Sequence, residues 1–129
     1  MNKIILGLLL FSSTLFSLEW VKDINTALNI AKKEHKNIMV FVEGENCGWC
    51  KKMKHGTLSD ASVKQRLEKF VVVKVMREDA KAMSILPSID GVPTIFFMKE
   101  NKAVIEEIIG YFNIEDFLSY INDVEKKAK

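Results

Sequence analysis

Two cysteines that closely follow a short apolar run constrain this chain more than any other feature. Residues 38–42 are all apolar, and the short length and β-branched content of the run predict a buried strand rather than a helix. After a loop over residues 43–46, a helix is predicted to begin at Cys47 and to run to about His55, where Gly56 stops it. Cys47 and Cys50 are therefore expected at a junction between a buried strand and a helix.

That placement predicts a redox function for the cysteine pair. At a helix start, unpaired backbone N–H groups and the helix dipole favour an anion, which lowers the pKa of the Cys47 thiol from about 8.5 and raises the fraction of thiolate. Cys50 lies about one turn later on the same face, so it can reach Cys47 and resolve a mixed disulfide by thiol exchange. The spacing therefore fits a catalytic nucleophile, Cys47, and a resolving thiol, Cys50.

Other uses of the two cysteines fit the sequence less well. They are the only cysteines of the chain and close no long loop, so a purely structural disulfide is not indicated. A zinc site usually needs four ligands, and the histidines at His35 and His55 have no spacing that implies convergence on the cysteines. Covalent haem requires a histidine directly after the second cysteine, where this chain has Lys51. We therefore expect neither a metal nor a cofactor.

The rest of the chain predicts an α/β fold with a mixed sheet and helices on both faces. Residues 23–36 have helical spacing of apolar residues, with Asp23 or Asn25 as the cap, and Asn113 is expected to cap a last amphipathic helix. Between them the pattern predicts a helix over 60–70, a strand over 71–75, a short helix or turn over 80–86 and a hairpin of strands over 95–98 and 103–109. Strands separated by helices pair in parallel, and the hairpin adds antiparallel strands.

The first residues have the layout of a secretory signal peptide. Lys3 is followed by an apolar run over residues 4–11, a softer stretch ends at the small residue Ser17, and the first acidic residue is Glu19. We expect a cleaved signal peptide over residues 1–17 and one domain over residues 18–129. The alternative is a membrane anchor over residues 4–18, which is shorter than the roughly 20 residues that a spanning helix needs. After cleavage no stable membrane insertion is expected.

Charge argues against a nucleic-acid partner. The 129 residues contain 19 Lys and Arg against 17 Asp and Glu, a net charge of +2 that falls to +1 without residues 1–17. A nearly neutral domain with mixed charges lacks the basic surface that nucleic acids require.

The sequence resembles the thioredoxin superfamily over nearly all of residues 18–129. The resemblance rests on Trp20, the helix over 27–36, the strand over 38–42, the cysteine motif with Lys51, Lys52 and Met53, and the tetrapeptide Gly91-Val92-Pro93-Thr94, in the expected order. It is greatest to exported thioredoxin-like proteins, a group similar to the C-terminal domain of the DsbD reductase. The resemblance implies the thioredoxin fold and thiol–disulfide interchange.

The resemblance also implies a second part of the site. In the family the proline matching Pro93 follows a cis peptide bond and packs beside the cysteines, a placement that is uncommon for a proline and occurs in tight turns. The backbone of the preceding residue, here Val92, is left free to pair with an extended substrate by β-augmentation. The alternative is a trans proline that begins a strand.

Two residues depart from thioredoxin itself. Trp49 replaces a proline between the cysteines, which leaves the reduction potential open; it either offers an apolar surface to partners or packs within the helix. Phe41 stands where thioredoxin has a buried aspartate that assists proton transfer. Glu43, on the same strand face by alternation, is a candidate substitute or a solvated strand end. Lys51, Lys52 and Lys54 either favour the thiolate or form a solvated face.

These observations predict a periplasmic thiol–disulfide oxidoreductase that reduces or exchanges disulfides. The implied partners are disulfide-containing exported proteins and an inner-membrane thiol electron donor. No dimerisation segment is evident, so a monomer is expected. The alternatives are an oxidase-like or isomerase-like protein and a non-catalytic binding module that shares the fold.

Overall fold

A computed structural model describes residues 18–129, so the predicted signal peptide over residues 1–17 lies outside the described residues. Residues 18–129 form four strands, five α-helices and one short 3-10 helix. In chain order these are α1 (Ile24–Glu34), β1 (Asn37–Glu43), α2 (Gly48–His55), η1 (Thr57–Ser59), α3 (Ala61–Leu67), β2 (Phe70–Met76), α4 (Ala80–Met83), β3 (Thr94–Met98), β4 (Val104–Ile109) and α5 (Ile114–Lys127).

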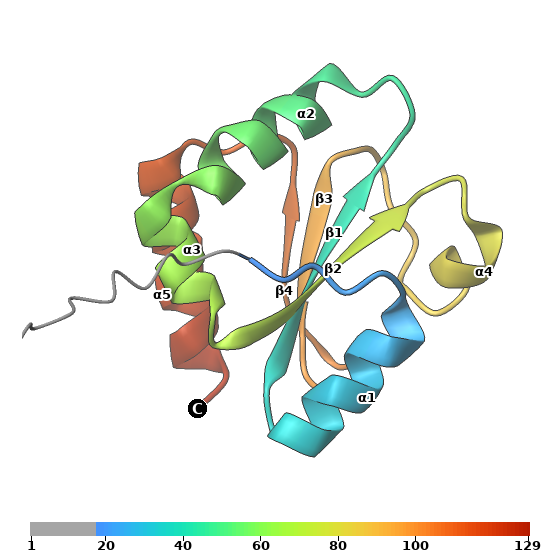
Figure 1. Ribbon diagram of the computed structural model, residues 1–129, viewed down its shortest axis with the longest axis vertical. Coiled ribbons are helices and arrows are strands. Elements are labelled where there is room, and N and C mark those ends of the chain that lie inside the picture. The colour runs from blue at the N-terminus through green and yellow to red at the C-terminus, as the bar shows by residue number, and fades with distance from the viewer. Residues whose placement is uncertain (1–17) are drawn as a thin grey trace, which may run out of the picture.

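The strands form one mixed sheet in the order β2-β1-β3-β4. β1 and β2 are parallel, as expected for strands joined through helices, whereas β3 is antiparallel to both β1 and β4. Helices α2, α3 and α5 cover one face, and α1 and α4 lie on the other (Figure 1). The predicted α/β thioredoxin fold is therefore confirmed.

Alternation along β1 divides the core into two layers. Met39 and Phe41 face the layer under α2, α3 and α5, whereas Ile38, Val40 and Val42 face the layer under α1. All five side chains are fully buried, because β1 is a central strand covered on both faces. The strand that leads to the cysteines is thus held rigidly by packing on both sides.

Two helices are shorter than predicted. The helix expected over 60–70 begins at Ala61, because the Asp60 side chain caps it from outside, and ends at Leu67. The segment expected over 80–86 is helical only over Ala80–Met83. The proline at position 87 disfavours helical geometry in the residue before it, and that residue, Leu86, turns into the core instead.

Within residues 18–129, no helix is both long enough and apolar enough to cross a bilayer.

Candidate active site

The cysteine pair lies at the amino end of α2, which follows β1 after a short loop. Cys47 is the N-cap of the helix and Cys50 lies in its first turn, so the helix begins as predicted. The two residues are joined by a disulfide, with their Cα atoms 5.2 Å apart. Only local helix geometry is needed to bring the two sulfur atoms together.

The two sulfurs have different surroundings. Cys47 is partly exposed, whereas Cys50 is 1% exposed and belongs to the core layer that contains Phe41 and Met53. The backbone N–H of Cys50 donates to Sγ of Cys47 over 3.1 Å. A donor aimed at this sulfur, together with the helix dipole, stabilises negative charge on Cys47 when the disulfide is open. The two cysteines are therefore chemically distinct.

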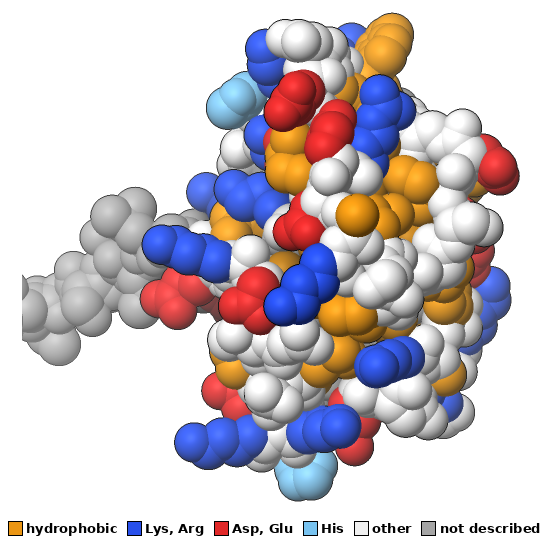
Figure 2. All heavy atoms as spheres, turned by 90° about the vertical axis from the view of Figure 1, so that its right-hand side faces the viewer, with side chains coloured by type: hydrophobic (Ala, Val, Ile, Leu, Met, Phe, Trp, Pro, Cys, Tyr) orange, Lys and Arg blue, Asp and Glu red, His pale blue; other side chains and the backbone are white. Residues whose placement is uncertain are grey.

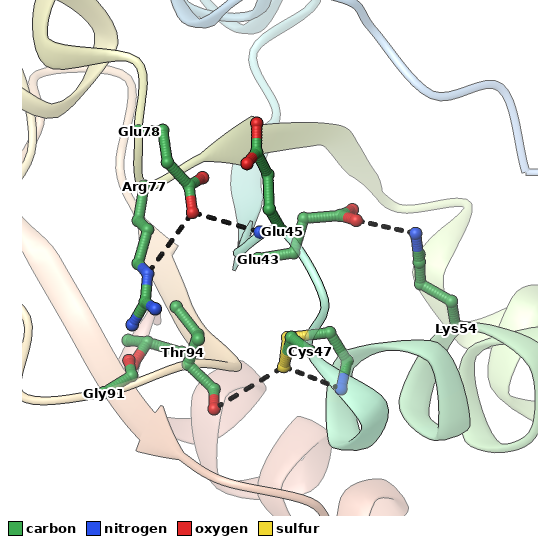
Figure 3. Close-up of a disulfide and its surroundings, with 10 residues drawn as sticks. Glu43, Glu45, Cys47, Lys54, Arg77, Glu78, Gly91 and Thr94 are labelled. Atoms are coloured by element: carbon green, nitrogen blue, oxygen red, sulfur yellow. Dashed lines mark hydrogen bonds and ion pairs between the residues drawn. A yellow bond between two sulfur atoms is a disulfide. The ribbon is translucent and has the colours of Figure 1, made fainter.

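The segment before β3 forms the wall facing the disulfide (Figure 3). The Val92–Pro93 peptide bond is cis, and the carbonyl oxygen of Val92 lies 3.9 Å from Sγ of Cys47. Pro93 is buried and accepts a hydrogen bond of 2.8 Å from the N–H of Gly110. The Thr94 hydroxyl donates to the carbonyl of Gly91 over 2.7 Å. These bonds hold the wall against both β3 and the end of β4.

Trp49 lies on the surface rather than inside the helix packing, with 57% of its area exposed. Its ring packs on that of Tyr111, with the centroids 5.6 Å apart. The Lys52 ammonium lies 5.0 Å from the Trp49 centroid and 4.6 Å from the Tyr111 centroid. Cation–π attraction on this scale orders both rings beside the cysteines.

Glu43 is almost buried and forms an ion pair. Its side chain is 12% exposed, and its carboxylate lies 2.6 Å from the ammonium of Lys54 on α2 (Figure 3). A buried carboxylate with a charged partner differs from the solvated strand end that was the alternative. Lys54 is also bound to this partner rather than free on a solvated face. A role for Glu43 in proton transfer stays a prediction.

An aromatic cluster occupies the place of thioredoxin's buried aspartate. Phe41 is fully buried, and Trp20 packs on it with ring centroids 6.2 Å apart. Lys74, paired with Phe41 across β1 and β2, places its ammonium 5.0 Å from the Trp20 centroid. The position therefore offers packing and no proton acceptor.

The loop before Cys47 is tied to the end of β2 by contacts that the sequence did not reveal. Gly44 is buried, and a Cβ there would lie 3.0 Å from Nε of Arg77 and 3.3 Å from Val92, so a side chain at this position would crowd both neighbours. The Glu78 carboxylate accepts from the N–H of Glu45 over 3.0 Å and lies 3.5 Å from Nε of Arg77 (Figure 3). The bond from the Glu45 N–H lowers the pKa of Glu78.

The sequence alone did not identify four residues around the site: Arg77, Glu78, Gly110 and Tyr111. Only tertiary pairing brings them near the cysteines, and the one local signal is the position of Gly110 directly after the strand predicted over 103–109.

The two histidines lie at the ends of helices. His35 ends α1 in the left-handed conformation, and His55 ends α2; both are exposed. Across residues 18–129, no three His, Cys, Asp or Glu side chains are grouped as metal ligands would be.

Comparison with known proteins agrees with this geometry. The family profile described as a thioredoxin-like domain matches residues 24–125. A thioredoxin from Thermus thermophilus is 26% identical, with a TM-score of 0.72 over 84% of this chain and 87% of that chain. No curated protein matches the sequence significantly.

Two further solved structures share the fold at lower identity. The oxidised DsbD C-terminal domain of Neisseria meningitidis is 23% identical, with a TM-score of 0.63 over 76% of this chain and 90% of that chain. The DsbH oxidoreductase is 21% identical, with a TM-score of 0.68 over 85% of each chain. With its paired Cys47 and Cys50, this chain belongs to the thioredoxin-like family and is a thiol–disulfide oxidoreductase.

Proposed function

We propose that Cys47 is the attacking thiolate and Cys50 the resolving thiol of a protein that reduces or exchanges disulfides in exported proteins. The observation that carries the assignment is the difference between the sulfurs. Cys47 is reachable from solvent and accepts the Cys50 N–H, whereas Cys50 is 1% exposed. An incoming protein disulfide can meet only the first sulfur before the helix moves.

The reaction proceeds in two successive thiol–disulfide exchanges. The Cys47 thiolate attacks one sulfur of the substrate disulfide; a Cys47–substrate bond forms and the other substrate sulfur leaves as a thiolate. Cys50 loses its proton and attacks Cys47, which forms the Cys47–Cys50 disulfide and releases the second substrate thiolate. The substrate gains two electrons and two protons, and the protein dithiol is oxidised.

The wall at Val92 is proposed to hold the substrate backbone. Its carbonyl oxygen is 3.9 Å from Sγ of Cys47, so an extended segment paired with Val92 brings its own cysteine next to Cys47. Pro93, buried behind Val92 and bonded to Gly110, keeps this edge in place.

We also propose that the protein works in the periplasm after removal of residues 1–17. The charged start, apolar run and small residue at Ser17 support export. An exported reductant must be reduced again after each turnover, so the proposal includes an inner-membrane thiol donor. The resemblance to DsbD-type domains supports the reducing direction.

Insulin reduction by dithiothreitol tests the catalytic assignment. The wild-type protein is expected to accelerate the reaction, and Cys47→Ser is expected to abolish the acceleration. Val104→Ala serves as the control, because Val104 is exposed near the hairpin end of β4 and pairs with Met98, away from Pro93. Equal acceleration by wild type and Cys47→Ser would refute the proposal.

Trapping identifies the partners. Cys50→Ala removes the resolving thiol, so mixed disulfides on Cys47 should accumulate in the native host and be released by reductant. Recovery of none, under conditions that trap a control thioredoxin, contradicts substrate exchange.

The reduction potential of the cysteine pair tests direction. A reductase is expected to lie nearer to the roughly −270 mV of thioredoxin than to the roughly −120 mV of DsbA, and about 30 mV shifts the equilibrium tenfold. Equilibration with glutathione buffers, read by alkylation of free thiols, measures it. A value near that of DsbA would favour the oxidase-like alternative.

A further inference from the structure

The loop between β1 and α2, residues 44–46, is fastened to the segment that follows β2. The N–H of Arg77 continues the parallel ladder past the end of β2 by donating to the carbonyl oxygen of Glu43 over 2.8 Å. Beyond it, the backbone N–H of Glu45 donates to a carboxylate oxygen of Glu78 over 3.0 Å. Across the described part of the chain, no hydrogen bond joins the other two residues of the loop to another segment. The bond between Glu45 and Glu78 is therefore the polar attachment of this loop.

The Glu78 carboxylate is itself held in place. Nε of Arg77 lies 3.5 Å from the carboxylate oxygen that accepts the Glu45 N–H. The Arg77 side chain in turn crosses the loop at Gly44, where a Cβ would lie 3.0 Å from its Nε. Figure 3 shows Arg77, Glu78 and Glu45 together on one side of the disulfide. The bond from the Glu45 N–H lowers the pKa of Glu78, so the acceptor is ionised at neutral pH.

The conformation of Asn46 gives this attachment a purpose. Asn46 has φ of 54°, in the left-handed region that residues other than glycine rarely adopt. It directly precedes Cys47, so its backbone angles determine how the chain enters α2. Cys47 is the N-cap of the helix, and its sulfur accepts the N–H of Cys50 over 3.1 Å. Relaxation of Asn46 to an extended conformation would carry this sulfur away from the start of the helix.

The attachment matters most when the disulfide is open. In the oxidised protein the covalent bond itself holds Cys47 beside Cys50, with the Cα atoms 5.2 Å apart. Reduction removes that restraint, and the position of Cys47 then depends on the loop before it. A contact that stabilises both redox forms equally cannot shift the equilibrium between them, whereas a contact that one form needs more does shift it.

We propose that Glu78 is a positioning residue that keeps Cys47 at the N-cap of α2 in the dithiol form. The inference rests on the proposed function, in which the Cys47 thiolate attacks the substrate disulfide. With the loop held, the thiolate accepts the Cys50 N–H and lies at the positive end of the helix dipole. Without Glu78 both interactions weaken, so the pKa of Cys47 rises and the pair becomes more reducing.

Three substitutions at position 78 separate the hydrogen bond from the charge. Glu78→Ala removes both, Glu78→Asp keeps the charge on a side chain too short to reach the loop, and Glu78→Gln keeps an acceptor oxygen at full length without the charge. The pH dependence of iodoacetamide alkylation, located by peptide mapping, gives the pKa of Cys47 in each reduced protein. Equilibration with glutathione buffers gives the reduction potential. Glu68→Ala removes an exposed carboxylate before the other end of β2 and serves as the control.

Glu78→Ala and Glu78→Asp should raise the pKa of Cys47 by about one unit, the scale of a hydrogen bond or a helix dipole acting on a charge. The equilibrium with glutathione should shift about tenfold toward the disulfide, which corresponds to a potential about 30 mV more negative. Glu78→Gln should leave the pKa at or below that of wild type, because the loop stays attached and a negative charge is removed. The other charged groups of the site, Glu43, Lys54 and Arg77, are the same in every variant. Glu68→Ala should change neither quantity.

The outcomes distinguish this inference from the proposed function. If Glu78→Ala and Glu78→Asp leave the glutathione equilibrium within about twofold of wild type, Glu78 stabilises both redox forms equally and the inference is overturned. It is also overturned if Glu78→Gln shifts the pKa and the potential as far as Glu78→Asp does. That last comparison decides the question by itself if Glu78→Ala does not fold. If the wild-type pair exchanges with neither glutathione nor insulin, the proposed function itself fails.

Discussion

At the scale of single residues, the difference between Cys47 and Cys50 comes from where the helix begins. The N-cap residue lies outside the core, whereas the residue three positions later faces inward against Phe41 and Met53. The same turn thus exposes one sulfur and buries the other.

That difference predicts selective alkylation of the reduced protein. Iodoacetamide at neutral pH should modify Cys47 at least about tenfold faster than Cys50, because Cys50 is 1% exposed and Cys47 is the proposed thiolate. Peptide mapping by mass spectrometry gives both rates, and the same reaction in denaturant provides the control. Equal rates in the folded protein would contradict the assignment of nucleophile and resolving thiol.

The ion pair between Glu43 and Lys54 joins the end of β1 to α2 and is expected to stabilise the folded protein. Lys54→Met leaves the Glu43 carboxylate, 12% exposed, without its partner and should lower the free energy of unfolding by about 1–3 kcal/mol. Adding Glu43→Gln should recover part of this loss, which a double-mutant cycle in urea quantifies. If Lys54→Met and Lys51→Met have equal effects, the ion pair contributes nothing measurable.

At the scale of elements, side-chain caps decide where helices begin. Asp23, Cys47, Asp60, Asp79 and Asn113 each accept a backbone N–H at the start of a helix. At Cys47 the capping position also carries the proposed nucleophile, so the geometry that begins α2 is expected to favour its thiolate as well.

The Asp60 cap predicts a pH dependence of stability. The Ser62 hydroxyl, and then the Val63 N–H, lower the pKa of Asp60 below its ordinary value near 3.8. A lowered folded pKa stabilises the protein above the unfolded pKa, and this contribution is lost as the pH falls through the folded pKa. Asp60→Ala should therefore lower the melting temperature at pH near 7, and its difference from wild type should shrink in acid. Asp90→Ala, in an exposed loop, should show neither effect.

At the scale of the whole molecule, the layer that contains Cys50 is locked by α5. Phe117 of α5 is fully buried and packs on Phe97 of β3, with ring centroids 6.2 Å apart. Phe97 in turn contacts Phe70 of β2. An aromatic chain thus links the last helix to the sheet beneath the active site.

On the face shown in Figure 2, acidic and basic side chains are interspersed between apolar ones, in accord with the nearly balanced composition.

Removing one ring from that chain should weaken the entire domain. Phe117→Ala is expected to lower the free energy of unfolding by about 3–5 kcal/mol, because it leaves a cavity in close-packed surroundings. Urea unfolding followed by circular dichroism measures the loss. Ile114→Ala, at a 40% exposed position of the same helix, should change stability by less than about 0.5 kcal/mol. A comparable loss in both variants would show that the packing of α5 matters less than its helical propensity.

Local patterns in the sequence determined the order of the elements, the mixed sheet and the position of the cysteine pair. The apolar run over 38–42 lies inside β1 (Asn37–Glu43), and Asp23, Gly56 and Asn113 bound their helices as expected. These features depend on neighbours a few residues apart, so periodicity and capping suffice to predict them.

The resemblance already implied that Val92 and Pro93 lie beside the cysteines, but the tertiary structure decided the other contacts around Cys47 and Cys50. The ring of Trp49 had two open interpretations until β4 and the following residues placed Tyr111 against it, and Glu43 had two until α2 placed Lys54 beside it. Gly110 reaches Pro93 because β3 and β4 pair in one particular register, and Arg77 reaches Gly44 across two parallel strands. Such contacts join segments far apart in the chain, and no local periodicity encodes them. The cysteine motif thus followed from the sequence alone, whereas the contacts of Trp49, Glu43 and Gly44 arose from the folded chain.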